Sequence, residues 1–237
     1  MIENLVSNNR IIPGLIILLS IIFFYFSNLD LLFINTLLVL ALYDLKFSRF
    51  LSLLNSCLLF ILLNTFFYFE YLINFQNIIS IIFLLVITMS LVFKKKFFFI
   101  FSIILFFIFS YKLLLLDREF FFILIAISFL NDTSAYLTGK NLGGPKIVPF
   151  ISPNKTWSGT LVSFFITLIT LILLKFNIYF SVILAISFFL GDIYFSYFKR
   201  LNKVDDFSNF LYGHGGILDR LDSIFLSIFL GYNFLIL

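Results

Sequence analysis

Residues 97–116 read FFFIFSIILFFIFSYKLLLL and contain a single charged side chain, Lys112. As an α-helix, an apolar run of this length crosses the ~30 Å hydrocarbon core of a bilayer. The composition of the whole chain agrees, because 62% of its residues are hydrophobic, only 12% are charged and the mean hydropathy is +1.14. Soluble domains carry about 25% charged residues. The sequence therefore predicts an integral membrane protein.

Apolar runs of similar length recur along the whole chain. Their approximate ranges are 11–28, 29–45, 50–70, 77–93, 97–116, 119–139, 158–174, 177–198 and 222–237. The first run is not followed by the small-residue cleavage site of a secretory signal, so we expect it to be retained as a span. The predicted fold class is an all-α integral membrane protein, a polytopic bundle of about nine transmembrane helices.

Basic residues are distributed unequally between alternate loops of this predicted bundle. If the N-terminus is cytoplasmic, thirteen of the sixteen Lys and Arg residues fall on the cytoplasmic side, and only Lys112, Arg118 and Lys175 fall on the other. Cytoplasmic loops of membrane proteins carry such an excess of Lys and Arg. We therefore predict a cytoplasmic N-terminus.

The polar residues divide the chain into two regions. Residues 1–130 hold apolar spans with few charges, and we expect them to form a scaffold that faces lipid or a second copy of the chain. Residues 131–237 hold the dense polar patches. Ionisable side chains beside membrane spans are costly and usually functional, so this second region is the predicted catalytic region, with its polar site facing the cytoplasm.

The first polar patch lies at the end of the predicted span 119–139. Asp132, Tyr136 and Lys140 recur every four residues and so share one helix face. The following loop adds three side chains suited to phosphate, which are Ser152, Lys155 and Thr156. Hydroxyl groups, a Lys charge and backbone N–H groups before a helix are typical of phosphate binding. The structural alternatives are an Asp132 bonded within the bundle and a Ser152 that forms a turn.

The second polar patch lies near the end of the run 177–198. Asp192, Ser196 and Lys199 are spaced to form one helical stripe, and Arg200 follows them. A carboxylate after a long apolar run is costly unless it is paired or binds a cation. Because Lys199 is two turns from Asp192, we favour a cation ligand over a direct ion pair.

The third polar patch contains the only histidine, His214, followed by Gly215 and Gly216. Asp219 and Asp222 are three residues apart, so on a continuous helix they would project from one face. Together with Asp192 they are predicted to bind Mg²⁺, which prefers carboxylate oxygens, water and substrate phosphates. His214 alone would be a structural histidine, but beside these acids we predict that it belongs to the site.

The order of these patches resembles the phosphatidate cytidylyltransferase, or CDP-diacylglycerol synthase, family. SYFKR at 196–200, DFS at 206–208 and HGGILDRLDS at 214–223 resemble the family signature SxxKRxxxxKDxS followed by HGGxxDRxDS. DTSAY at 132–136 resembles the family's DTGAY, and SPNKTWSG at 152–159 resembles SPKKTWEG. The chain departs from the family pattern at Ser134, Asn154, Ser158, Asp205 and Tyr212. Asp205 replaces a Lys and so reverses a charge beside the predicted nucleotide site.

The resemblance implies the reaction of CTP with phosphatidate to give CDP-diacylglycerol and pyrophosphate. The implied cofactor is Mg²⁺, and the resemblance leaves open whether a second cation binds. The implied catalytic residues are Lys199, Arg200, His214, Asp219 and Asp222. The implied substrate-binding residues are Asp132, Ser152, Lys155, Thr156, Ser196, Asp206 and Arg220. The implied metal ligands are Asp192, Asp219 and Asp222.

The implied partners are CTP, phosphatidate and membrane lipid, and no nucleic acid is expected. The resemblance leaves open whether the protein forms a homodimer. The implied location is a bacterial-type inner (plasma) membrane, crossed several times, with the active site on the cytoplasmic face. Two alternatives remain. A related CTP-dependent or polyprenol-modifying membrane transferase would differ only in its lipid. A cation-coupled transporter would explain Asp132 and Asp192, but not the Gly-His-Gly-Gly turn joined to Asp-Arg-Leu-Asp.

Overall fold

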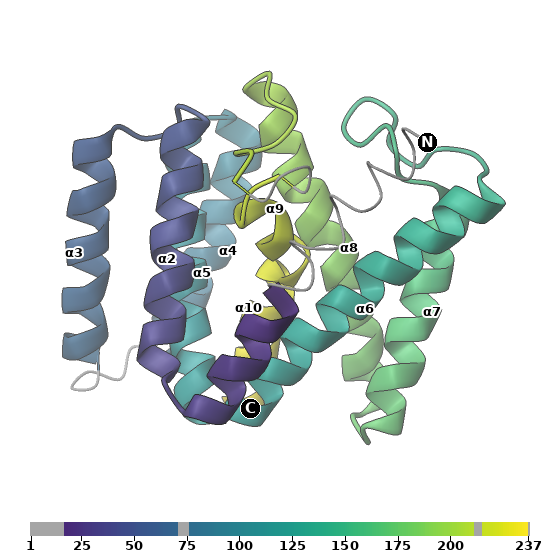
Figure 1. The fold of residues 1–237 in the computed structure, drawn as a ribbon, viewed down its shortest axis with the longest axis horizontal. Helices are drawn as coiled ribbons and strands as arrows, with labels where there is room; N and C mark the ends of the chain where they lie inside the picture. The colour runs from purple at the N-terminus through teal and green to yellow at the C-terminus, as the bar shows by residue number, and fades with distance from the viewer. Residues whose placement is uncertain (1–16, 71–75, 211–214, 237) are drawn as a thin grey trace. The chain divides into compact units, whose positions relative to one another are not determined.

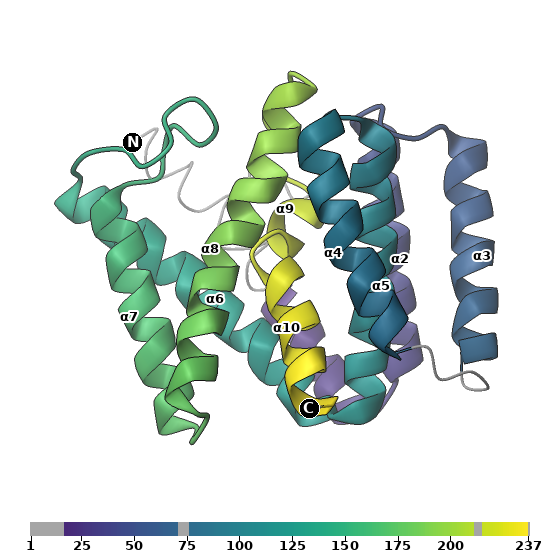
Figure 2. The same cartoon turned by 180° about the vertical axis from the view of Figure 1, so that it is seen from behind.

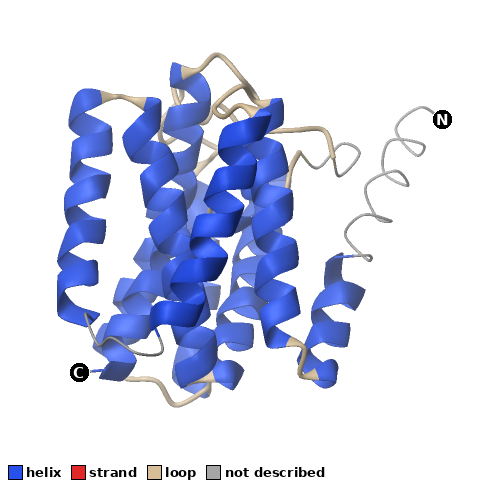
Figure 3. Cartoon of the chain, turned by 90° about the vertical axis from the view of Figure 1, so that its left-hand side faces the viewer, coloured by secondary structure: helices blue, strands red, loops and turns tan. Residues whose placement is uncertain are grey.

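The computed structural model describes residues 17–70, 76–210 and 215–236, and these residues form helices and loops (Figure 3). The first described helix spans Ile17–Ser27 and carries no label in the figures. The labelled helices are α2 (Asp30–Phe47), α3 (Leu53–Glu70), α4 (Gln76–Phe93), α5 (Lys96–Leu116), α6 (Arg118–Leu142), α7 (Trp157–Leu173), α8 (Ile178–Leu201), α9 (Leu218–Leu221) and α10 (Ile224–Ile236). The predicted all-helical class is confirmed for this part of the chain.

The predicted apolar runs coincide with these helices. Within the described residues, three helices, α5, α6 and α8, are long and apolar enough to cross a membrane. Five shorter apolar helices accompany them, which are Ile17–Ser27, Leu53–Thr65, Ile78–Phe93, Trp157–Leu173 and Ile224–Ile236. Helix α2 carries three charged residues, Asp30, Asp44 and Lys46. The number of spans and the orientation of the N-terminus stay predictions.

The chain divides into two compact units that differ from the predicted regions. The first unit contains Met1–Tyr111 and Val204–Arg220, and the second contains Lys112–Lys203 and Leu221–Leu237. Much of the third polar patch, from Val204 to Arg220, therefore groups with the N-terminal helices and not with the rest of the predicted catalytic region. The scaffold and catalytic roles of the two regions stay predictions.

In the first unit, three phenylalanine rings join the loop before α9 to the N-terminal helices. Phe50 follows α2, Phe99 lies on α5 and Phe207 lies in the loop itself. Helices α2 and α5 are labelled in Figure 1. The ring centroid of Phe207 lies 5.7 Å from that of Phe50 and 5.9 Å from that of Phe99. Phe99 and Phe207 are fully buried. Contacts of this kind add to the apolar area that each ring removes from solvent, so the loop is packed onto its unit.

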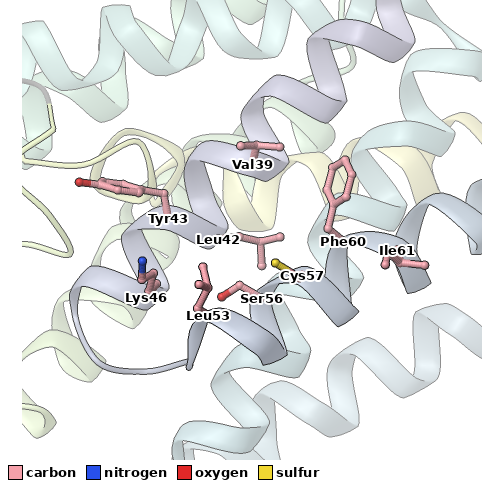
Figure 4. A pocket seen from close by; sticks show the side chains of 9 residues that line it. All are labelled: Val39, Leu42, Tyr43, Lys46, Leu53, Ser56, Cys57, Phe60 and Ile61. Carbon is pink, nitrogen blue, oxygen red and sulfur yellow. The ribbon is translucent and has the colours of Figure 1, made fainter.

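A pocket of about 380 Å³ lies between α2 and α3 in the same unit. Its lining is mostly apolar and consists of Val39, Leu42, Tyr43, Lys46, Leu53, Ser56, Cys57, Phe60 and Ile61 (Figure 4). Cys57, the single cysteine of the chain, is exposed in it. The pocket contains none of the predicted site residues.

The second unit is built on the packing of α6 against α7 and of α8 against both α7 and α10. Figure 2 shows α8 and α10 side by side from behind. Asn131 and Thr167 form a buried hydrogen bond of 3.2 Å between α6 and α7. Small residues allow these two helices to approach closely, because a Cβ added at Gly159 would lie 2.6 Å from the carbonyl oxygen of Ala135.

We expect Gly159→Ala to destabilise the second unit. Alanine favours a helix over glycine by up to ~1 kcal/mol, but overpacking against the α6 backbone costs about 1–3 kcal/mol. The midpoint of thermal unfolding in detergent should therefore fall. Ile169→Ala, which removes an exposed side chain from the same helix, should change it little. A Gly159→Ala midpoint equal to or above that of the parent protein would contradict the close α6–α7 approach.

Candidate functional site

The loop between α6 and α7 is held closed by its own hydrogen bonds. The Ile147 amide donates to the Lys155 carbonyl at 3.2 Å, and the Trp157 amide donates to the Pro145 carbonyl at 3.1 Å. Thr156 is buried, and its hydroxyl accepts a hydrogen bond from the Gly159 amide at 3.2 Å. It is therefore the N-cap of α7. This structural bond gives Thr156 a role that the sequence did not predict.

Asp192 forms an ion pair with Lys155. The charge of this carboxylate is therefore compensated within the second unit by a lysine as well as being available to a metal ion. The Lys155 ammonium contacts Asp192 Oδ2, and both side chains are about one-quarter exposed. The Ser196 hydroxyl donates to Asp192 Oδ1 at 3.3 Å, as the predicted helical stripe requires. The sequence did not identify the partner, because Lys155 comes from the loop before α7 and not from α8.

Arg200 connects the same loop to the end of α8 by a hydrogen bond. Its Nε donates to the carbonyl oxygen of Ile151 at 3.1 Å, directly before Ser152. The Ser152 amide donates to the Val148 carbonyl at 2.9 Å, which makes Ser152 part of a turn. A guanidinium has five N–H donors, so this bond is compatible with phosphate binding by the same side chain.

Lys199 and Asp222 form a second pair of opposite charges in this unit. The Lys199 ammonium lies 4.0 Å from Asp222 Oδ2, and both side chains are only 9% exposed. Asp222 Oδ1 also accepts a hydrogen bond from the Ser223 amide at 2.8 Å. Removal of one member of a buried pair costs about 3–5 kcal/mol, because the remaining buried charge loses this opposite charge. Lys199 and Asp222 therefore depend on each other.

Gly191 allows the backbone at Asp222 to approach α8. A Cβ at residue 191 would contact the Asp222 carbonyl oxygen directly and would lie 3.1 Å from the Ser223 carbonyl oxygen. Only glycine leaves room for such an approach. The position of Asp222 beside α8 therefore depends on the absence of a side chain at residue 191.

Asp132 lies on α6 and contacts the turn that precedes α10. The Ser223 hydroxyl donates to Asp132 Oδ2 at 3.4 Å and shares a 2.7 Å hydrogen bond with the Ser128 hydroxyl. The Lys140 ammonium lies 5.9 Å from the centroid of the Tyr136 ring, in agreement with the predicted common face of α6. The second unit therefore contains, within its own fold, the predicted residues Asp132, Ser152, Lys155, Thr156, Asp192, Ser196, Lys199, Arg200 and Asp222.

In the first unit, Asp219 organises the loop before α9. Its Oδ2 accepts hydrogen bonds from the Gly216 amide at 2.8 Å and the Phe207 amide at 3.0 Å. Gly215 has a φ of +75°, and a Cβ there would lie 2.6 Å from Asp219 Oδ2, so glycine is required on both grounds. Asp206 is exposed and Arg220 is half-buried. The predicted site residue His214 lies outside the described residues.

The prediction that Asp219 and Asp222 lie on one continuous helix is wrong. Helix α9 has four residues and ends at Leu221, and Asp222 and Ser223 form a turn before α10 begins at Ile224. The Asp222 carboxylate accepts a hydrogen bond from the next backbone amide. Such local side-chain bonds compete with helix formation, which accounts for the break.

Within the described residues of either unit, no three His, Cys, Asp or Glu side chains form a metal-binding group. The predicted ligand set of Asp192, Asp219 and Asp222 therefore stays a prediction. The sequence also missed one acidic residue, Asp44 on α2, which is fully buried. Its signal was an ionisable side chain within an apolar run.

The second unit thus defines a class of site. Lys155 contacts Asp192, and Lys199 lies near Asp222, so the unit combines positive side chains that can bind phosphate groups with carboxylates that can bind cations. The chain belongs to the cytidylyltransferase family, whose sequence model matches residues 8–237.

Curated relatives agree with this family. The chain is 40% identical to the phosphatidate cytidylyltransferase of Rickettsia bellii, over 40% of this chain and 48% of the relative. It is 35% identical to that of Rickettsia typhi, over 49% of this chain and 59% of the relative. It is 47% identical to that of Staphylococcus aureus, over 41% of each chain. The matched part is about half the length of these relatives.

We expect Gly191→Ala to reduce the cytidylyl transfer that family membership implies. The added methyl group would push the Asp222 backbone away from α8, and a displacement near 1 Å in an active site can lower turnover about 100-fold. Ile186→Ala on the same helix, where the side chain is exposed, should retain parental turnover. Turnover of CTP measured on purified, folded variants tests this, and parental activity in Gly191→Ala would disprove the required approach.

Proposed function

We propose that this protein is a phosphatidate cytidylyltransferase, which converts CTP and phosphatidate to CDP-diacylglycerol and pyrophosphate in phospholipid biosynthesis. Family membership supports transfer of a cytidylyl group. The names of the curated relatives support phosphatidate as the acceptor. The match of residues 196–223 to the family signature supports the same reaction.

The observation that carries this proposal is the pairing of Lys155 with Asp192 and of Lys199 with Asp222 in one unit. Each pair combines a cation that can bind phosphate oxygens with a carboxylate that can bind a metal ion. A triphosphate with its metal ion offers the complementary charges to both members of a pair. The nucleotide can therefore replace contacts within the resting pairs without leaving buried charges uncompensated.

In the proposed reaction, an oxygen of the lipid phosphate attacks the α-phosphorus of CTP. A new bond forms between this oxygen and the α-phosphorus. The bond between the α-phosphorus and the oxygen that bridges to the β-phosphorus breaks, and pyrophosphate leaves with its electron pair. The attacking phosphate is already ionised near neutral pH, so no general base is required. Phosphoryl-type transfer depends chiefly on positioning and charge stabilisation. Lys199, Arg200 and Lys155 supply positive charge to phosphate oxygens in this scheme.

The remaining predicted residues have supporting roles in the proposal. Ser152, Ser196 and His214 orient substrate, while Thr156 acts through the N-terminus of α7 that it caps. Asp132 acts through Ser223, the neighbour of Asp222. Asp206 and Arg220 lie on either side of the segment around His214 in the sequence and bind the nucleotide.

In this proposal, Asp192, Asp219 and Asp222 would be the ligands for Mg²⁺, with one or two ions bound. When bound, Mg²⁺ would neutralise charge on the triphosphate and on the leaving pyrophosphate. The donor set fits this ion, since Mg²⁺ prefers carboxylate oxygens. Asp219 already accepts two backbone N–H bonds on Oδ2, but a carboxylate has about four lone-pair positions. The same side chain can therefore hold the loop and a cation.

The proposed setting is the inner membrane of a bacterium, crossed by about nine spans, with the N-terminus and the active site on the cytoplasmic side. The charge bias of the loops supports this orientation. So does the bond between Arg200, at the end of α8, and Ile151 in the α6–α7 loop, because both lie in segments predicted to be cytoplasmic. The proposal does not depend on whether the protein is a monomer or a homodimer.

The reaction is tested with purified protein in detergent, labelled CTP, and phosphatidate or a polyprenyl phosphate as acceptor, with and without Mg²⁺. We expect labelled CDP-diacylglycerol and pyrophosphate only with phosphatidate and Mg²⁺. Product from the polyprenyl phosphate alone would favour the related lipid transferase. The absence of any metal-dependent CDP-lipid from folded protein would overturn the proposed function.

Two substitutions of Asp219 separate its structural and catalytic roles. The asparagine side chain in D219N would retain an oxygen for the Phe207 and Gly216 amides, but it lacks the negative charge that a metal ion needs. We therefore expect D219N to keep the parental unfolding midpoint and to lose about 100-fold or more in turnover, or ~3 kcal/mol. D219A should lower both the midpoint and the turnover. Parental turnover in D219N would remove Asp219 from the metal site.

A further inference from the structure

Asp44 places a fully buried carboxylate near the end of α2, in a region that the sequence marks only as scaffold. Both of its carboxylate oxygens have partners in the segment that leads into α9. Oδ1 accepts a hydrogen bond from the Ser208 hydroxyl at 2.6 Å, and Oδ2 accepts one from the Leu218 amide at 2.8 Å. These partners are 164 and 174 residues away in the sequence.

The two partners lie at opposite ends of one segment. Ser208 precedes the residues around His214, and Leu218 begins α9 directly before Asp219. A single side chain on α2 therefore contacts both the residues before the gap in the described chain, at Ser208, and the residues after it, at Leu218. Hydrogen bonds to an ionised carboxylate are among the stronger ones in proteins, so these bonds limit the positions that Ser208 and Leu218 can adopt.

Gly216 shows how closely the segment approaches Asp44. A Cβ at residue 216 would contact Asp44 Oδ2 directly and would lie 2.7 Å from Oδ1. The carboxylate therefore packs against the backbone at Gly216. Asp219 holds the same residue through the Gly216 amide. The backbone at residue 216 is thus enclosed by two carboxylates.

A buried carboxylate is costly in an apolar chain unless its bonds are satisfied. An apolar residue at position 44 would avoid this cost and would suit the surrounding helix, whose neighbouring buried side chains include Ala41, Leu42 and Leu45. The side-chain bonds that Asp44 makes to Ser208 and Leu218 are directed to the segment that leads to Asp219. Its side chain therefore serves this segment and not the packing of α2.

We propose that Asp44 is a positioning residue for cytidylyl transfer, which fixes Gly216 and the start of α9 so that Asp219 is held in its working orientation. This inference rests on the proposed function for its effect on turnover. Its structural part, the attachment of the loop by Asp44, stands independently. Asp44 acts through Ser208 and Leu218 and touches no substrate in this proposal.

The proposal is tested by comparing D44A and D44N with the parent protein. The amide introduced by D44N can accept from the Leu218 amide with its oxygen and donate to the Ser208 hydroxyl with its nitrogen, whereas the methyl group introduced by D44A can do neither. We expect D44A to increase hydrogen exchange of peptides covering residues 205–222 by about 10-fold or more. Peptides from α6 to α8 should exchange as in the parent. D44N should largely restore the protection.

Turnover should follow the same order. We expect kcat of D44A to fall about 10-fold to 100-fold, because a loosened loop populates the working geometry less often, and D44N to recover most of this loss. D30N, which removes a charge at the other end of α2, is the matched control and should behave as the parent. Where D44A does not fold, Ser208→Ala removes one of the two bonds and should produce a smaller increase in exchange over 205–222.

The outcomes are distinguishable. Parental exchange over residues 205–222 in D44A, or an equal increase in every peptide, would overturn the positioning role. Faster local exchange with parental kcat would also overturn it, since the attachment would then not affect transfer. If the parent protein forms no CDP-diacylglycerol, the proposed function fails, while the exchange data still decide whether Asp44 holds the loop.

Discussion

The charge of a carboxylate in an apolar chain must be compensated, and this constraint governs the arrangement of the polar segments described above. Asp192 and Asp222 are each paired with a lysine. Asp219 and Asp44 accept hydrogen bonds from backbone amides. Uncompensated, such groups would oppose folding strongly. The acids therefore determine where the loops lie, and one of these loops carries residues 206–208 and 215–217 of the family signature.

The helices could be predicted from the sequence because apolar runs of span length have few alternatives to the helix. The stripe from Asp192 to Ser196 followed from helical spacing alone. The partner of Asp192 could not be predicted, since Lys155 reaches it through tertiary packing and not through periodicity. The break at Asp222 was also missed, because the helical pattern takes no account of a carboxylate that binds the next backbone amide.

The N-terminal helices contact more of the family signature than their sequence indicates. The segment from Val204 to Arg220 groups with them, packed through Phe207 and bonded through Ser208 and Leu218. Apolar composition gave no sign of this, as Phe99 and Phe50 resemble the many other phenylalanines of the chain. Asp44 alone among these contacts stood out chemically. A motif near the C-terminus is thus held by residues that motif comparison does not identify.

The contact between Gly216 and Asp44 links the permitted residues at two distant positions. No side chain fits at residue 216 while the carboxylate occupies its place, and a carboxylate at residue 44 is costly without the loop beside it. A side chain at residue 216, or the loss of the hydrogen-bonding side chain at residue 44, would therefore be unfavourable alone, although a joint change could be tolerated. Such a pair is difficult to alter by single mutational steps, so packing limits the residues permitted at position 216 in addition to any chemistry of the segment.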